Sequence, residues 1–167
     1  MKFSKKQIDR YSRQIILKKV GIVGQKKLLK SSVLIVGAGG LGSPIAIYLA
    51  ALGIGKIGII DKDHVDISNL SRQIIFETND IKKSKSSAAI AKLKKINPDI
   101  QLKSFNENLT LKNIDKIAKN FDLIIDGSDN FKTRFLINNY CFRNKKILIS
   151  GAISKFDGQV YTFNFSK

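Results

Sequence analysis

The sequence Val-Leu-Ile-Val-Gly-Ala-Gly-Gly-Leu-Gly, residues 33–42, organises the rest of the chain. Its opening residues are apolar and mostly β-branched, which predicts a strand buried on both faces. Gly37, Gly39 and Gly42 follow with the G-x-G-x-x-G spacing, in which the backbone turns tightly and can approach a ligand closely. A helix is expected over residues 44–52, and the free N–H groups of its first turn face the loop. This strand, loop and helix therefore predict a phosphate site, although some turns of this kind hold no ligand.

The segments that follow alternate between strand and helix patterns. Strands are predicted at 56–60, 100–105, 123–125 and 146–150, and helices at 84–96, 111–118 and 131–142. This alternation predicts an α/β fold, a Rossmann-like parallel sheet with helices on both faces. A capping box at Ser4 and apolar residues at helical spacing predict an additional helix near the N-terminus. We therefore expect an N-terminal helical segment, 1–30, and a Rossmann-like ATP-binding domain, 31–167.

Aromatic residues dominate the end of the chain. Residues 159–165 alternate Tyr161, Phe163 and Phe165 with smaller side chains, which predicts a strand with one aromatic face. Natural domains normally cover such a strand, because an exposed aromatic edge promotes aggregation. We therefore expect that the chain either pairs with another subunit here or has lost a C-terminal part.

Composition limits the surroundings and partners of the protein. The formal charge is +17, but the lysines are spread along the chain rather than gathered in one stripe, so nucleic acid is not an expected partner. Cys141 is the only cysteine, which excludes an internal disulfide and a zinc site of paired cysteines. We expect it to be a small buried side chain of its helix, in which Phe135, Leu136 and Tyr140 are also available for packing. Because no apolar run approaches the roughly 20 residues of a membrane span and no secretory signal is present, we expect a cytoplasmic protein without a membrane segment.

Polar residues that follow the first, second and fourth strands should meet in one crevice, because ligands bind beyond the carboxyl ends of parallel strands. Asp61 lies about 20 residues after the glycine loop, where an acidic side chain can hold ribose hydroxyls. Arg72 and Lys85 bring positive charge, and Asp129 brings a carboxylate able to hold Mg²⁺. This set favours phosphate chemistry. An NAD-dependent oxidoreductase would explain the glycine loop and Asp61 but would leave the other residues without a role.

An ordered series of motifs resembles the MoeB/ThiF group of adenylyltransferases, which are relatives of the ubiquitin-activating enzymes. The motifs are Arg10-Tyr11-Ser12-Arg13-Gln14, the glycine loop at 36–42, Asp61-Lys62-Asp63, Ser68-Asn69-Leu70-Ser71-Arg72-Gln73, Ile125-Asp126-Gly127-Ser128-Asp129-Asn130 and Ser150-Gly151-Ala152. The likeness covers essentially all 167 residues. In this group, ATP activates the C-terminal glycine carboxylate of a small ubiquitin-like sulfur carrier, ThiS-like or MoaD-like, for thiamine or molybdenum-cofactor biosynthesis. The products are an acyl adenylate and pyrophosphate.

The resemblance implies a role for each matching position. The implied nucleotide-binding residues are Gly37, Gly39, Gly40, Gly42, Asp61, Asn69, Arg72, Lys85, Asp129 and Asn130. Within this set Asp61 would hold the ribose, while Asn69, Arg72 and Lys85 would contact phosphates. Asp129 would hold Mg²⁺ or help to position the reacting groups. Arg13 would reach into the site of a second subunit, which implies a homodimer.

Members of the group usually continue further, with paired Cys-x-x-Cys zinc ligands and a segment that guides the carrier tail. Neither is found in residues 1–167, so we expect that a C-terminal part is missing. The remaining alternative is therefore a truncated, non-catalytic remnant that binds a nucleotide or dimerises without turnover.

A general base is not needed for the implied reaction, because the attacking carboxylate is already ionised at pH 7.

Overall fold

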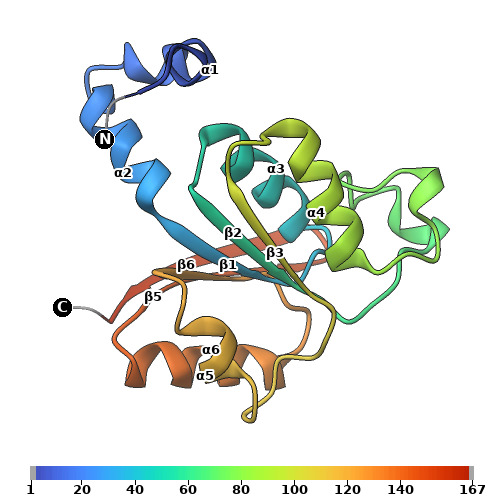
Figure 1. Ribbon diagram of the computed structural model, residues 1–167. Coiled ribbons are helices and arrows are strands. Elements are labelled where there is room, and N and C mark those ends of the chain that lie inside the picture. Colours follow the sequence, from blue (N-terminus) through green and yellow to red (C-terminus); the bar gives the residue numbers. More distant parts are fainter. Residues whose placement is uncertain (1–2, 166–167) are drawn as a thin grey trace.

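The computed structural model of the chain describes residues 3–165. The helices are α1 (Lys5–Ile15), α2 (Gly21–Lys30), α3 (Gly42–Leu52), α4 (Lys85–Ile96), α5 (Ile114–Ala118) and α6 (Phe131–Arg143). The strands are β1 (Ser32–Val36), β2 (Lys56–Ile60), β3 (Gln101–Phe105), β4 (Leu123–Asp126), β5 (Ile147–Ser154) and β6 (Asp157–Asn164). The strands form one six-stranded sheet in the order β3-β2-β1-β4-β5-β6 (Figure 1). The predicted Rossmann-like α/β fold is thus confirmed.

One strand departs from the predicted parallel arrangement. Strands β1 to β5 are parallel, but β6 runs antiparallel to β5, with Ser154 opposite Asp157. The connection between them is the tight turn at Lys155 and Phe156, which is far too short for the crossover that a parallel neighbour requires. The last strand therefore closes the sheet as a hairpin.

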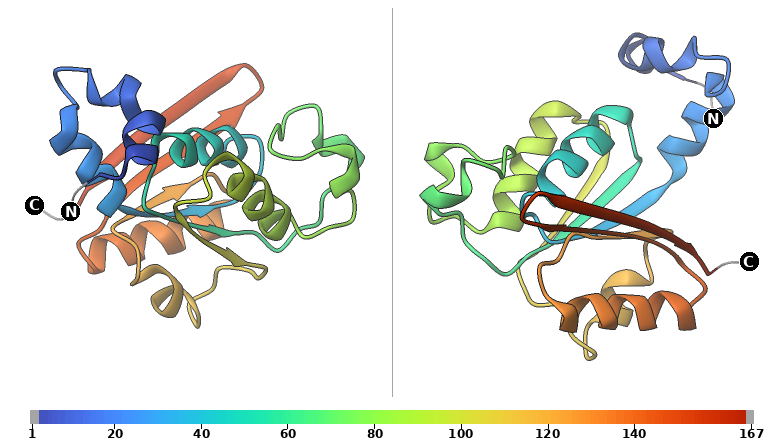
Figure 2. Two further views of the ribbon diagram at one scale, coloured as in Figure 1. Left: turned by 45° about the horizontal axis from the view of Figure 1, so that its top comes forward. Right: turned by 180° about the vertical axis from the view of Figure 1, so that it is seen from behind.

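Helices cover both faces of the sheet, α3 and α4 one face and α5 and α6 the other (Figures 1 and 2). Successive residues of β1 supply both cores, because side chains alternate across a strand. Ile35 is buried with residues of α3 and α4, such as Leu93. Its neighbour Leu34 is buried on the opposite face with Phe121 and with Ile137 of α6. The sheet centre is therefore apolar on both sides, and polar groups can gather only at the strand ends.

The glycine loop between β1 and α3 is packed against its own backbone. Gly37 has a φ of 92°, a conformation that side-chain-bearing residues rarely adopt. A Cβ on Gly42 would lie 1.9 Å from the carbonyl oxygen of Gly37, which is far inside van der Waals contact. The third glycine of the spacing therefore permits the close approach of α3 to β1.

Substitution of Gly42 by alanine is expected to lower the free energy of unfolding by about 3 kcal/mol, the upper end of the usual overpacking cost, because the clash is with backbone. Gly158→Ala is the matched control, since a Cβ at Gly158 meets nothing within 4 Å. Urea denaturation of both variants measures the difference. Equal stability of the two variants would contradict the close packing of the loop.

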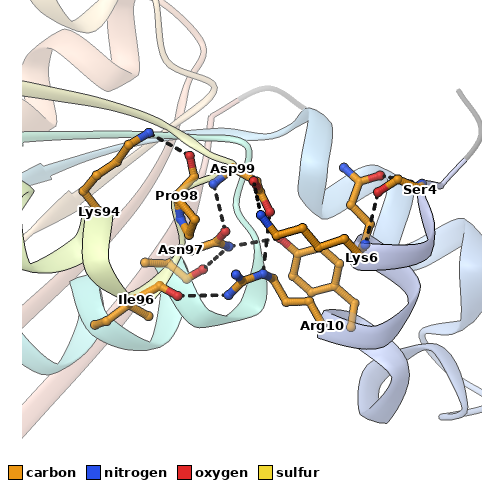
Figure 3. A network of polar contacts seen from close by, with 11 residues as sticks. Ser4, Lys6, Arg10, Lys94, Ile96, Asn97, Pro98 and Asp99 are labelled. Atoms are coloured by element: carbon orange, nitrogen blue, oxygen red, sulfur yellow. Dashed lines mark hydrogen bonds and ion pairs between the residues drawn. The ribbon is translucent and has the colours of Figure 1, made fainter.

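Helix α1 is anchored to the core by polar contacts. Its predicted capping box at Ser4 is present. The fully buried Tyr11 accepts a hydrogen bond at its hydroxyl from Nδ2 of Asn97, over 3.0 Å. Arg10 donates from Nη1 to the carbonyl oxygen of Ile96 at the end of α4, over 2.9 Å (Figure 3). The direction in which α1 presents its other side chains is therefore fixed relative to the sheet.

The aromatic face predicted for the last strand is present. The rings of Tyr161 and Phe163 stack with centroids 6.1 Å apart, and those of Phe163 and Phe165 with centroids 5.8 Å apart. In α6, however, the expected packing of Phe135 was wrong, because its side chain is 63% exposed. The buried stripe of α6 begins at Ile137, about 200° around the helix from Phe135, and continues at Tyr140.

Several predicted element bounds also needed correction, and the two largest changes are in α5 and β5. The helix expected from residue 111 begins at Ile114, after a turn that Asn113 stabilises by accepting a hydrogen bond from the backbone N–H of Thr110. The strand expected at 146–150 continues to Ser154. Within the described residues no helix has the length and apolarity that crossing a bilayer requires.

Cys141 is expected to resist thiol reagents in the folded protein. Its side chain is fully buried, and burial raises the pKa of the thiol to about 12, so the reactive thiolate is suppressed at pH 8. Titration with a chromogenic disulfide should give no rapid reaction until denaturant is added. Immediate reaction of the native chain at pH 8 would show that this side of α6 is not packed against the sheet.

Candidate functional site

A cleft of about 920 Å³ lies at the carboxyl ends of the strands. Its walls come from the glycine loop, the connection after β2, the start of α4 and the loop between β4 and α6. The predicted site residues that line it are Gly37, Gly39, Gly40, Asp61, Asn69, Arg72, Lys85, Asp129 and Asn130. The topology therefore brings together residues that are up to about 90 positions apart in sequence.

Asp61 joins two loops at the floor of the cleft. Its Oδ2 accepts a hydrogen bond from the backbone N–H of Ala38 over 2.8 Å, and its Oδ1 accepts one from the N–H of Asp63 over 2.8 Å. The carboxylate thus holds the glycine loop and the start of the next connection at a fixed separation. This turn-stabilising role accompanies the predicted contact with ribose, which stays a prediction.

Lys85 supplies a buried positive charge. It is the first residue of α4 and is only 7% exposed, although it lines the cleft. Its Nζ lies 3.6 Å from Oδ2 of Asp63, whose own side chain is largely exposed. Because water screens much of this ion pair, the ammonium group keeps most of its attraction for an anion in the cleft.

Asn69 and Arg72 belong to a tight turn beside the glycine loop. Asn69 is buried, and its Oδ1 accepts a hydrogen bond from the backbone N–H of Asp66 over 3.1 Å. Hydrogen bonds from Ser68 lower the pKa of the Asp66 carboxyl, which therefore stays ionised and caps the turn. Arg72 donates from Nη1 to the carbonyl oxygen of Ser68 over 2.9 Å. The turn thereby holds a second cation at the cleft.

The loop after β4 presents Asp129 and Asn130. Asn130 is the N-cap of α6, and its Oδ1 accepts a hydrogen bond from the backbone N–H of Thr133 over 2.9 Å. Asp129 is exposed, with its Oδ1 3.4 Å from Nδ2 of Asn130. Asp126, at the end of β4, is 1% exposed and is held by hydrogen bonds within the fold. Of the two carboxylates around this loop, the one available to a ligand is therefore that of Asp129.

Two predicted site residues lie outside the cleft. Gly42 does not line it and acts in the packing of α3 against β1. Arg13 is exposed on α1, which stands at the opposite end of the sheet from the connection 61–84 (Figures 1 and 2). Arg13 therefore cannot serve the cleft of its own chain.

The cleft also contains residues that the sequence reasoning left without a role. Gln73 is 4% exposed, and its Oε1 has no hydrogen-bond partner among residues 3–165. Gln73 could have been found, because it ends the motif that contains Arg72. Arg134 and the loop 107–109 line the cleft as well, but nothing in the spacing of the sequence marks them.

A divalent cation would depend on a bound ligand for most of its coordination. Within the part of the chain that the structure describes, no group of three or more His, Cys, Asp and Glu side chains could hold a metal ion. Mg²⁺ is commonly bound by one or two carboxylates together with phosphate oxygens and water. The exposed carboxylate of Asp129 fits that pattern.

The chain resembles proteins of known activity over nearly its whole length. A "Probable molybdopterin-synthase adenylyltransferase" of Porphyra purpurea is 50% identical over 163 residues, which are 98% of this chain and 43% of the relative. A "Sulfur carrier protein adenylyltransferase" of Thermus thermophilus is 43% identical over 164 residues, which are 98% of this chain and 60% of the relative. The chain thus spans about half the length of the curated relatives that it matches.

Solved structures show the same fold. E. coli tRNA N6-threonylcarbamoyladenosine dehydratase superimposes with a TM-score of 0.87 at 26% identity, over 94% of this chain and 66% of that protein. E. coli MccB, solved with ATP, superimposes with a TM-score of 0.79 at 28% identity, over 89% of this chain and 46% of MccB. The sequence profile of the ThiF family matches residues 11–167, so the glycine loop and the whole cleft fall within the match, and the chain is a member of the ThiF family.

Proposed function

We propose that this chain uses ATP to adenylate the C-terminal carboxylate of a ubiquitin-like sulfur carrier protein. The observation that carries the proposal is the convergence, in one cleft, of a glycine loop, the cations Arg72 and Lys85, and the exposed carboxylate of Asp129. Two comparisons support it. The Thermus thermophilus relative is named a sulfur carrier protein adenylyltransferase, and MccB of similar fold was solved with ATP.

The proposed reaction exchanges a phosphoric anhydride bond of ATP for a mixed carboxylic–phosphoric anhydride bond. A carboxylate oxygen of the carrier attacks the α-phosphorus of ATP, forming a C–O–P linkage, and the bond from the α-phosphorus to the bridging oxygen breaks. Pyrophosphate leaves with that oxygen and its electron pair. No proton is transferred at the carboxylate, because it is ionised at pH 7. The site must therefore hold two anions together and neutralise the charge of the phosphates.

The residues of the cleft suit these tasks. The glycine loop that lines the cleft leads directly into the N-terminus of α3, whose positive dipole end favours a phosphate there. Arg72 and Lys85 would pair with phosphate oxygens, and Asp61 would accept a hydrogen bond from the ribose. Asp129 would hold Mg²⁺, which when bound neutralises charge on the triphosphate.

A second copy of the chain completes the proposed site. Arg13 is exposed on α1, which stands at the opposite end of the sheet from the connection 61–84, so we propose a homodimer in which it serves the cleft of the partner (Figures 1 and 2). We place the dimer in the cytoplasm, where the reducing conditions suit a chain whose only cysteine is free and buried.

Calorimetry and isotope exchange test the proposal together. We expect the chain to bind ATP with Mg²⁺ but not NAD, and to exchange labelled pyrophosphate into ATP only when a ThiS-like or MoaD-like carrier is present. NAD binding would instead support an oxidoreductase. ATP binding without carrier-dependent exchange would support the non-catalytic remnant, and the absence of binding to either nucleotide would contradict the proposed site.

A further inference from the structure

Arg134 connects three segments around the cleft. It lies in the first turns of α6, and its side chain is 28% exposed. Its Nε donates to Oδ2 of Asp126 over 3.1 Å, and its Nη2 donates to the carbonyl oxygens of Ser128, over 3.0 Å, and Gly151, over 2.9 Å. The rigid planar fork of a guanidinium group can make such divergent contacts at once. One side chain thus joins the end of β4, the loop after it and β5.

The partner carboxylate is fully engaged within the fold. Asp126 is 1% exposed, and its Oδ2 also accepts a hydrogen bond from Oγ of Ser150 over 2.7 Å. Its Oδ1 accepts hydrogen bonds from the backbone N–H and the Oγ of Ser128, over 3.0 and 2.6 Å. Ser128 is therefore held from two sides, by Asp126 at its N–H and hydroxyl and by Arg134 at its carbonyl oxygen.

The carbonyl group of Ser128, which accepts a hydrogen bond from Arg134, belongs to the peptide bond between Ser128 and Asp129. The side chain of Asp129 is exposed, and its described contact is the 3.4 Å approach of Asn130. The orientation of this carboxylate therefore depends on the backbone that carries it. Arg134 also holds Gly151, which precedes the β5 residues 152–154 on the facing wall of the cleft.

We propose that Arg134 is a positioning residue that fixes the carboxylate of Asp129 relative to the opposite wall of the nucleotide cleft. The proposal deepens the proposed function and rests on it for the identity of the ligand. The simpler role, neutralisation of the buried Asp126, requires only a positive charge at this position. The positioning role requires the guanidinium fork, because a lysine offers one ammonium group in place of several diverging N–H donors.

Arg134→Lys separates the two roles, with Arg143→Lys at the exposed end of the same helix as the matched control. We expect Arg134→Lys to retain its thermal midpoint but to exchange backbone amides across residues 127–130 about tenfold faster than the unaltered chain. We also expect its carrier-dependent exchange rate to fall by about 10- to 100-fold and to require more Mg²⁺. Arg143→Lys should change none of these measurements.

Several outcomes would overturn the inference. Unchanged amide exchange at 127–130 together with an unchanged Mg²⁺ dependence in Arg134→Lys would show that charge alone suffices. A large loss of thermal stability in Arg134→Lys, with slower turnover but unchanged Mg²⁺ dependence, would also overturn it. The amide measurement needs no ligand, so it tests the positioning role separately from the proposed function. Failure of the proposed function would instead be seen in the unaltered chain, which would bind no ATP with Mg²⁺.

Discussion

Asp129→Ala is expected to lower carrier-dependent ATP–pyrophosphate exchange by about 100- to 1,000-fold, the usual effect of removing one preorganised electrostatic contact from an active site. The carboxylate of Asp129 is exposed in the cleft, whereas that of Asp126 is buried and engaged within the fold. Its removal would take away the proposed protein ligand of Mg²⁺ without exposing the core. The unfolding midpoint should therefore stay close to that of the unaltered chain.

Arg72→Ala should have an effect of similar size for a different reason, because it removes a cation beside the glycine loop. Initial rates of isotope exchange at saturating carrier, and nucleotide affinity by calorimetry, measure both variants. Asp157→Ala, in the exposed strand β6, is the matched control. Exchange within twofold of the unaltered chain in both Asp129→Ala and Arg72→Ala would refute the assigned site.

The strands and helices around the glycine loop could be predicted because local rules agree there. Apolar, β-branched residues define β1, and the glycines that follow leave few alternatives to a tight turn. Gly53, in the left-handed conformation at the end of α3, stops the helix where the sequence predicts it. Long-range contacts were not needed for these predictions.

Other parts of the fold depend on contacts that no local pattern reveals. The exposure of Phe135 follows from which side of α6 faces the sheet, and an apolar residue by itself does not indicate that side. The antiparallel direction of β6 follows from the short turn after Ser154. The sequence pattern does not indicate this turn, because β5 is longer than that pattern predicts.

The candidate site likewise has residues that could be predicted from the sequence and residues that could not. The positions of Asp61, Arg72, Lys85 and Asp129 could be predicted, because the ends of parallel strands must converge at one edge of the sheet. Arg134 could not, because its role depends on segments near 126 and 151 that meet only in the fold. An arginine fork of this kind has no sequence spacing of its own.

The position of Arg13 within one chain leads to a prediction about a dimer of two chains. Tyr11 and Arg10 anchor α1 to the ends of the neighbouring helices, so Arg13 cannot swing around the sheet to its own cleft. Apolar side chains are exposed at the end of α1 and on α2, among them Ile16, the C-cap of α1, at 69% and Val23 at 69%. A surface of this kind is suited to burial against a second subunit.

Mixing two inactive variants is therefore expected to restore activity. Arg13→Ala and Asp129→Ala should each lose exchange by about 100-fold or more when assayed alone. After the two are mixed and allowed to exchange subunits, about half of the dimers carry one chain of each kind. In such a dimer, the Arg13→Ala chain keeps its own Asp129 and receives Arg13 from its partner, so one of the two sites is intact. Exchange should recover to about a quarter of the unaltered rate per chain, whereas variants that act within one chain cannot complement each other. Absence of recovery, with mixed dimers demonstrated by mass spectrometry, would place Arg13 outside the site of the partner and reduce α1 to a structural element.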